Sequence, residues 1–341
     1  MKIFLSALTR SFALRSAQRV SKGMFSANPS PFETRCALLR VNGLEFLKVV
    51  FVSLFSLALV ACAKTPFSDL KPQSTQITNG HLEYYAFGHG SPVVLIEGYA
   101  TDVTSWDKRF LLALAADHRV IVFNNRGVGG SWVNSESYTP HDLAADTHEL
   151  IEGLHLQAPA VIGISMGGMI AEELAILYPQ SVGKLILINT AVPGAASIRP
   201  SEEVEEHLLD MPTSHWGRYT LALHYFFPKD ARRKMAYDLA VDRFQPDIYE
   251  EIDIAKVIPL QKEFLRAWLR DETSAAQLSQ LKMPVLILNG LADEVLPPEN
   301  SVILQHHIPH AQLVRWQNGG HAMIYQFPDS LAAAINQFLK G

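Results

Sequence analysis

A G-x-S-x-G motif at residues 163–167 constrains the fold of this chain more than any other feature of its sequence. The apolar run 159–164 is typical of a buried strand, and 166–178 is typical of a helix that Pro179 ends. The two glycines carry no Cβ, so the backbones of the strand and the helix can almost touch and hold a strained serine between them. The motif also occurs in ordinary tight turns. In its strand–turn–helix context it predicts a nucleophile elbow that exposes the Ser165 hydroxyl.

Strand-length apolar runs alternate with helix-length segments over most of the chain. Strands are predicted at 76–78, 81–87, 92–98, 118–124, 159–164, 184–189, 284–289 and 312–316. Helices are predicted at 106–116, 141–154, 166–178, 299–307 and 330–339. The first two strands flank Asn79-Gly80, a strong hairpin turn signal. Alternation of strands and helices implies right-handed crossovers, so we expect an α/β fold with a mostly parallel sheet flanked by helices.

The alternation stops between residues 191 and 274, where glutamates, histidines and aromatic residues dominate and no buried strand is visible. Short helices with an aromatic face are predicted there, inserted between the sixth and seventh strands. We therefore divide the folded part into a core, residues 76–190 and 275–341, and an inserted helical segment. The aromatic face of that segment is more often helix-packing core than a substrate pocket.

Residues 1–61 are predicted to be a leader. The apolar run 48–61 follows a positive charge, is shorter than the roughly 17–25 residues of a bilayer-spanning helix, and suits a signal peptide. The letters L-V-A-C at 59–62 end this run and resemble a bacterial lipobox, which implies cleavage before Cys62 and lipidation of that cysteine. In that resemblance, Ala63 favours the outer membrane over the inner membrane of a bacterial envelope.

Other interpretations of the N-terminal region stay open. The apolar run could be an uncleaved single-pass anchor. Residues 1–32 are rich in arginine and serine and contain no acid, which is typical of a mitochondrial transit peptide. A lipoprotein signal starts about twenty residues before its cysteine, so residues 1–40 could reflect a start codon assigned too far upstream. Residues 62–75, polar with two prolines, are predicted to be a tether.

Composition excludes several other classes of protein. The net charge of −5 and the absence of a Lys/Arg run argue against a nucleic-acid partner. The two cysteines, Cys36 and Cys62, lie in the N-terminal part and provide neither a disulfide framework nor a Cys-based zinc site for the core. No H-E-x-x-H spacing occurs, so no metal site is predicted.

The partners that a serine nucleophile needs follow Ser165 in the required order. A serine hydroxyl reacts when a histidine takes its proton and an acid orients that histidine. Asp293 comes shortly after the strand 284–289, and His321 comes shortly after the strand 312–316. Both lie at the carboxyl ends of parallel strands, where open α/β sheets place their sites. We predict a Ser165-His321-Asp293 triad, with Glu294 as the nearest competitor for the acid.

From about residue 76 to its end, the chain resembles an α/β-hydrolase of the lipase, esterase and lactonase-like branch. The motifs that carry the resemblance are G-I-S-M-G at 163–167, G-L-A-D at 290–293, G-G-H at 319–321 and N-R-G-V-G-G-S at 125–131. The resemblance implies that the inserted segment is a cap and that the backbone N–H groups of Tyr99 and Met166 form an oxyanion hole. The chain departs from the family in having Asn124 or Asn125 where an aspartate is usual, and Glu97 where a histidine is frequent.

The triad and the resemblance together predict a serine hydrolase. The expected substrate is a carboxylic ester or lactone of small or medium size and hydrophobic character, cleaved through an acyl-enzyme without a metal or organic cofactor. A C–C bond hydrolase, an aminopeptidase or a perhydrolase would carry the same triad. A binding module that keeps the fold without catalysis is the alternative from another class of protein.

Overall fold

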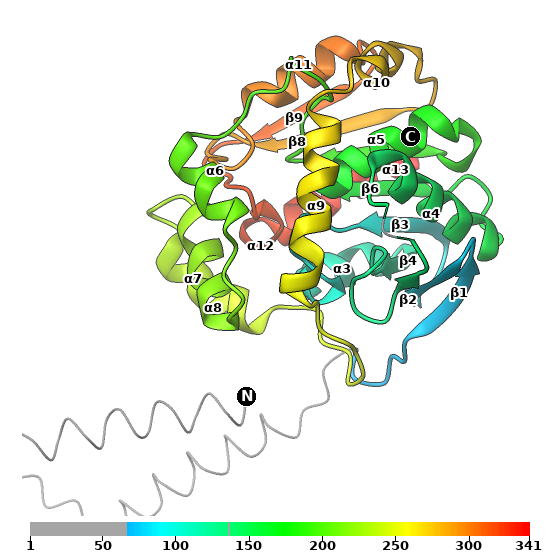
Figure 1. Cartoon of the computed structure of the whole chain (residues 1–341), viewed down its shortest axis with the longest axis horizontal. Helices are drawn as coiled ribbons and strands as arrows, with labels where there is room; N and C mark the ends of the chain where they lie inside the picture. Colours follow the sequence, from blue (N-terminus) through cyan, green and yellow to red (C-terminus); the bar gives the residue numbers. More distant parts are fainter. Residues whose placement is uncertain (1–66, 136) are drawn as a thin grey trace, which may run out of the picture. The chain divides into compact units, whose positions relative to one another are not determined.

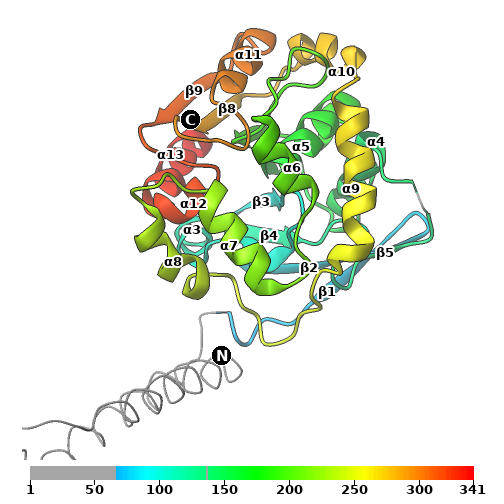
Figure 2. The ribbon, with the colours of Figure 1, turned by 60° about the vertical axis from the view of Figure 1, so that its left-hand side comes forward.

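The computed structural model describes residues 67–135 and 137–341 (Figures 1 and 2). The predicted leader and Cys62 lie outside these ranges. Among the residues that the structure describes, no helix combines the length and the apolar character needed to cross a membrane.

The described residues form one sheet of nine strands in the order β1-β2-β4-β3-β6-β7-β8-β9, with the short β5 paired to β2. The strands are β1 (Gln73–Ile77), β2 (Gly80–Gly88), β3 (Ser91–Ile96), β4 (His118–Phe123), β5 (Trp132–Val133), β6 (Ala160–Ile164), β7 (Lys184–Ile188), β8 (Val285–Gly290) and β9 (Gln312–Trp316). The pairs from β4 through β3 to β9 are parallel, whereas β1, β2 and β4 pair in antiparallel fashion. The predicted α/β fold is confirmed. The two-residue β5 was missed because it is too short to show a period.

Helices cover both faces of the sheet because its strands are apolar on both sides. The helices of the core are α3 (Lys108–Ala115), α4 (Pro140–Gly153), α5 (Met166–Leu177), α11 (Glu299–His307), α12 (Met323–Gln326) and α13 (Pro328–Lys340). Val94 and Ile96 of β3 pack in the cluster that contains α4, α5 and α11. Val93 and Leu95, which point to the opposite face, pack in the cluster that contains α3 and α13. This alternation gives the three-layer arrangement of helices, sheet and helices.

Five α-helices and one short 3-10 helix (Leu278–Gln280) connect β7 to β8, in and just after the region where short helices were predicted. The α-helices are α6 (Glu202–Leu209), α7 (His215–Tyr225), α8 (Arg232–Val241), α9 (Ile254–Trp268) and α10 (Glu272–Gln277). Because β5 lies off the main path of the sheet, β7 and β8 are the sixth and seventh strands of that path. The α9 helix, yellow near the centre of Figure 1, contacts the loop after β3 through Gln261. We refer to residues 191–274 as the cap.

The packed core begins earlier in the chain than the predicted boundary at residue 76. Phe67 is buried, and its ring lies 4.9 Å from the ring of Phe87 and 4.8 Å from that of Phe244 in the cap. The strand β1 starts at Gln73. The prediction of a tether that reaches residue 75 is therefore corrected. This part of the fold could not be recognised in the sequence, because β1 is a polar edge strand and Phe67 is an isolated aromatic residue.

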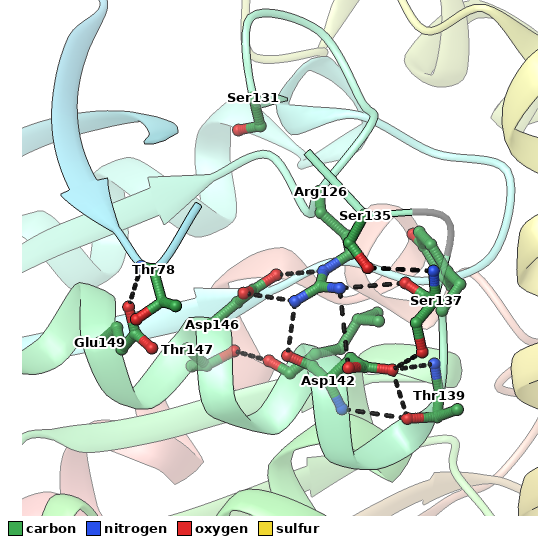
Figure 3. Close-up of polar contacts among 12 residues, drawn as sticks. Thr78, Arg126, Ser131, Ser135, Ser137, Thr139, Asp142, Asp146, Thr147 and Glu149 are labelled. Atoms are coloured by element: carbon green, nitrogen blue, oxygen red, sulfur yellow. Dashed lines mark hydrogen bonds and ion pairs between the residues drawn. The ribbon is translucent and has the colours of Figure 1, made fainter. Parts of the chain in front are cut away.

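The loop after β4 is fixed by a buried arginine (Figure 3). Arg126 donates from Nη2 to Asp146 Oδ1 of α4 over 2.7 Å and from Nη1 to the carbonyl of Ser137 over 3.0 Å. The α4 helix begins with a capping box in which Thr139 and Asp142 exchange hydrogen bonds between side chain and backbone. These contacts hold the loop at 124–131 against α4, and that loop in turn supports the residues after β3.

Candidate active site

Ser165 lies between β6 and α5 with φ 55° and ψ −124°, a strained backbone conformation for a residue with a side chain. A Cβ on Gly163 would lie 2.2 Å from the carbonyl oxygen of Gly167, and a Cβ on Gly167 would lie 2.2 Å from that of Ile96. Only glycine fits at these two positions. The predicted strand–turn–helix is present, and the two glycines permit the close approach of the backbones.

The structure brings Ser165, His321 and Asp293 together. His321 Nε2 lies 3.0 Å from Ser165 Oγ, and His321 Nδ1 lies 2.8 Å from Asp293 Oδ2. His321 and Asp293 are 6% and 3% exposed, so the chain of hydrogen bonds is largely shielded from water. With a proton on Nδ1, the imidazole donates to the carboxylate and can accept the serine proton at Nε2.

The carboxylate of Asp293 is held by the loop that follows β8. Its Oδ1 accepts hydrogen bonds from the backbone N–H groups of Val295 (2.8 Å) and Leu296 (2.9 Å), which leaves Oδ2 for His321. Glu294, the competitor considered from the sequence, is exposed. The acid in contact with His321 is Asp293.

Asn189 and Thr190, directly after β7, support the site and were not predicted from the sequence. Asn189 Nδ2 donates to the carbonyls of Gly320 (3.1 Å) and His321 (2.8 Å). Its Oδ1 accepts from the backbone N–H of Gly290 over 2.9 Å. The Thr190 hydroxyl donates to the carbonyl of Ser165 over 2.9 Å. Their place at a strand end was visible in the sequence, but their backbone partners depend on how the loops meet.

The predicted oxyanion donors lie on the two segments that meet at Ser165. Met166 is the first residue of α5, and the first N–H groups of a helix have no partner within it. On the other side, a Cβ on Gly98 would lie 3.2 Å from Ser165 Cβ and 3.7 Å from Oγ. The backbone leading to Tyr99 therefore passes directly beside the serine side chain.

Glu97 is completely buried beneath this backbone. Its Oε1 accepts a hydrogen bond from the N–H of Asn125 over 3.3 Å, and its Oε2 has no hydrogen-bond partner among the described residues. Burial raises the pKa of Glu97 well above its usual range, and the charge of the nearby Asp102 adds to the shift. Burial therefore favours the protonated, neutral form of this carboxyl. Where the resemblance leads us to expect a histidine, the chain has an acid whose burial disfavours a negative charge beside the serine.

The cap contacts the site at Phe226. Its ring lies edge-on to the imidazole of His321 with the centroids 5.3 Å apart, and its carbonyl accepts from the N–H of Ala322 over 3.1 Å. Other aromatic residues of the cap differ in exposure: Tyr225 and Phe227 are buried, whereas Trp216 is 60% exposed. No cluster of three or more potential metal ligands is found within residues 67–135 and 137–341.

Comparison with known proteins identifies the family. A family model described as the alpha/beta hydrolase fold matches residues 91–328. The chain therefore belongs to the α/β-hydrolase fold family, as the fold and the motifs predicted.

Among individual proteins, the chain is 27% identical over 267 residues to BpoC of Mycobacterium tuberculosis, named as a non-heme bromoperoxidase. The match covers 76% of this chain and 97% of that protein. It is also 27% identical over 297 residues to rhodomycin D methylesterase DnrP of Streptomyces peucetius, covering 76% of this chain and 95% of the relative. An α/β-hydrolase fold protein from Chitinophaga pinensis superposes with a TM-score of 0.71 at 21% identity, covering 81% of this chain and 99% of that one. The two relatives matched by sequence support a hydrolase of this fold, and the superposed structure shows the same fold.

Proposed function

We propose that the protein is a serine hydrolase that cleaves a carboxylic ester or lactone of a small or medium-sized hydrophobic substrate. The observation that carries the proposal is the continuous chain of hydrogen bonds from Asp293 through His321 to Ser165, with lengths of 2.8 and 3.0 Å. This geometry supports Ser165 as nucleophile, His321 as base and Asp293 as orienting acid in acyl transfer.

In this mechanism His321 Nε2 takes the proton of Ser165 as Oγ attacks the ester carbonyl. The resulting imidazolium is stabilised by Asp293 and then gives its proton to the leaving alkoxide, so that an acyl-enzyme remains. His321 next takes a proton from a water molecule as that water attacks the acyl-enzyme. The imidazolium then returns the proton to Ser165 Oγ as the bond from Oγ to the acyl carbon breaks and the acid is released. Every proton moves through the one imidazole that contacts the serine.

The oxyanion of each tetrahedral intermediate is held in this proposal by the backbone N–H groups of Tyr99 and Met166. One such donor typically lowers the barrier by roughly 2.7–4 kcal/mol. The first turn of α5 adds the positive end of its dipole. Burial of Glu97 disfavours its charged form, and so disfavours a negative charge that would oppose the oxyanion.

An ester is favoured over other substrates because one relative is named as a methylesterase. The same triad would serve a C–C bond hydrolase, an aminopeptidase or a perhydrolase, in which hydrogen peroxide replaces water as the acyl acceptor. The class furthest from this proposal is a non-catalytic binding module. A protein of that class would turn over none of these substrates.

The experiment is hydrolysis of p-nitrophenyl esters from acetate to palmitate by wild type and Ser165→Ala. We expect turnover with a maximum at one chain length in wild type and none above background in the variant. Folded wild type without turnover on any ester would count against the proposal and favour amide or C–C bonds, which are tested next with p-nitroanilides and β-diketones.

We propose separately that Cys62 is lipidated and attaches the protein to a bacterial envelope membrane, the outer one by preference. The support is the lipobox-like sequence at the end of the apolar run. Because one acyl chain binds membranes only marginally, stable attachment requires the several chains that this resemblance implies. Labelling with a clickable fatty acid should be lost in Cys62→Ser and kept in Cys36→Ser. Equal labelling of both variants would refute the anchor.

A further inference from the structure

We propose that Thr101 and Gln261 are positioning residues that fix the two peptide groups on either side of Tyr99 and so aim its N–H at the oxyanion. The inference rests on the proposed function and names the side chains that would make the oxyanion hole rigid. One of them comes from the loop itself and the other comes from the cap.

The first peptide group joins Gly98 to Tyr99. The hydroxyl of Thr101 donates to the carbonyl oxygen of Gly98 over 2.8 Å. That carbonyl and the N–H of Tyr99 belong to one planar trans peptide, so they point in opposite directions. Holding the carbonyl toward Thr101 therefore holds the N–H in the opposite direction. A peptide that accepts a hydrogen bond at its oxygen is also polarised, which strengthens the N–H as a donor.

The second peptide group joins Tyr99 to Ala100. The N–H of Ala100 donates to Gln261 Oε1 over 2.7 Å, and Gln261 is fully buried on α9 of the cap. Ala100 has φ 58°, a left-handed conformation that costs energy for a residue with a Cβ. The hydrogen bond to Gln261 offsets that strain and holds the turn.

The same bond decides which N–H is available to a substrate. Because the N–H of Ala100 is already paired with Gln261, it cannot serve as the oxyanion donor, which in this proposal is the N–H of Tyr99. Gln261 is itself held in place, since its Nε2 lies 3.4 Å from the hydroxyl of Tyr138, another buried side chain. The orientation of the oxyanion donor thus depends on the position of α9, which links the cap to the chemistry.

The loop has little freedom to compensate if either contact is lost. Gly98 already packs against Ser165, and the carbonyl of Glu97 lies 2.5 Å from where a Cβ on Gly167 would be. A hydrogen bond weakens steeply when its angle falls below about 120°. Even a modest rotation of the peptide therefore reduces the stabilisation of the transition state while leaving the substrate pocket in place.

The test compares Thr101→Val, which removes the hydroxyl at constant shape, with Thr101→Ser, which keeps it. Loss of a whole oxyanion donor lowers kcat by about 10²–10³-fold, and we expect misorientation to give at least about ten-fold. Thr101→Val should therefore lower kcat on the best p-nitrophenyl ester by about ten-fold or more, with KM within about two-fold. Thr101→Ser should retain kcat within about two-fold. Melting temperatures of all variants control for folding.

A second pair of variants addresses the cap. Gln261→Met removes the acceptor at similar volume and should lower kcat in the same way, whereas Gln261→Glu keeps an acceptor oxygen and should retain more of it. If Thr101→Val does not fold, these two Gln261 variants test the inference in its place. In the variant that combines Thr101→Val with Gln261→Met, the loss should be smaller than the product of the single losses, because both act through one N–H.

The outcomes separate the inference from the function on which it rests. Wild type that hydrolyses no ester overturns the proposed function. Active wild type with unchanged kcat in Thr101→Val and Gln261→Met overturns the inference alone. Equal losses in Thr101→Val and Thr101→Ser also overturn it, because they would assign the effect to packing of the methyl group. A change confined to KM would likewise exclude a role in the transition state.

Discussion

The free energy of unfolding of Glu97→Gln, relative to that of wild type, should increase as the pH rises. Glu97 is completely buried, one carboxyl oxygen has no hydrogen-bond partner among the described residues, and burial raises its pKa well above the ordinary range. Glutamine has the same shape and is neutral at every pH. Glu97→Gln therefore replaces the protonated carboxyl without removing the acceptor oxygen that the Asn125 N–H uses.

The magnitude follows from proton linkage. In the unfolded chain the carboxyl ionises near its ordinary pKa of 4.5, whereas the folded protein keeps its proton to a higher pH. Between these two pKa values the folded state binds one proton more than the unfolded state, so the free energy of unfolding falls as the pH rises. The slope approaches about 1.4 kcal/mol per pH unit for one proton. Glu97→Gln removes this contribution, and its advantage over wild type should grow at that rate.

The assay is urea unfolding of wild type and Glu97→Gln at pH 5.5, 6.5 and 7.5 and constant ionic strength. Glu172 is a second buried acid whose pKa is raised by desolvation, but it is present in both proteins and cancels in the difference. Glu206→Gln, at an exposed glutamate of the cap, is the matched control and should leave the slope unchanged. Parallel curves for wild type and Glu97→Gln would refute the reasoning, since they would mean that Glu97 ionises in the folded protein.

Three further perturbations test the site and its support. Asp293→Asn should lower kcat by about 10³–10⁴-fold because the imidazole loses its orienting acid, and kcat near the wild-type value would exclude Asp293 from the triad. In Gly98→Ala the added Cβ would lie 3.2 Å from Ser165 Cβ, so we expect a fluorophosphonate to modify Ser165 more slowly at an unchanged melting temperature. An unaltered rate of modification would contradict the expected crowding. Arg126→Met leaves Asp146 buried without its partner and should lower the free energy of unfolding by about 3–5 kcal/mol; a loss below about 1 kcal/mol in urea unfolding would show that the pair is solvated.

The sequence was sufficient to predict the parallel part of the sheet and the three residues that meet at its carboxyl edge. Buried parallel strands are nearly continuous apolar runs, so 92–98, 118–124 and 284–289 could be recognised directly. Ser165 and Asp293 could be placed because each follows such a strand. His321 could be placed because it follows the predicted strand 312–316, although that strand is mostly exposed. Their order along the chain then restricted the possible arrangement of the site.

Features that depend on contacts between distant loops could not be predicted. Asn189 looked like an ordinary residue at the end of a strand, although its side chain joins the loops that carry Asp293 and His321. Gln261 is one of many polar residues in the inserted segment, and only the packing of α9 shows that it pairs with Ala100. Phe67 lay in a segment with two prolines, which gave no sign that its ring packs against the cap.

The most direct test of the central claim is labelling of the protein with a fluorophosphonate, followed by mass spectrometry of the intact chain and of its peptides. A reactive serine in contact with a histidine should form one covalent adduct, and the modified peptide should contain Ser165. Ser165→Ala should form none, and Asp293→Asn should react far more slowly than wild type. Folded wild type that remains unmodified, or an adduct that persists in Ser165→Ala, would contradict the assignment of Ser165 as the nucleophile.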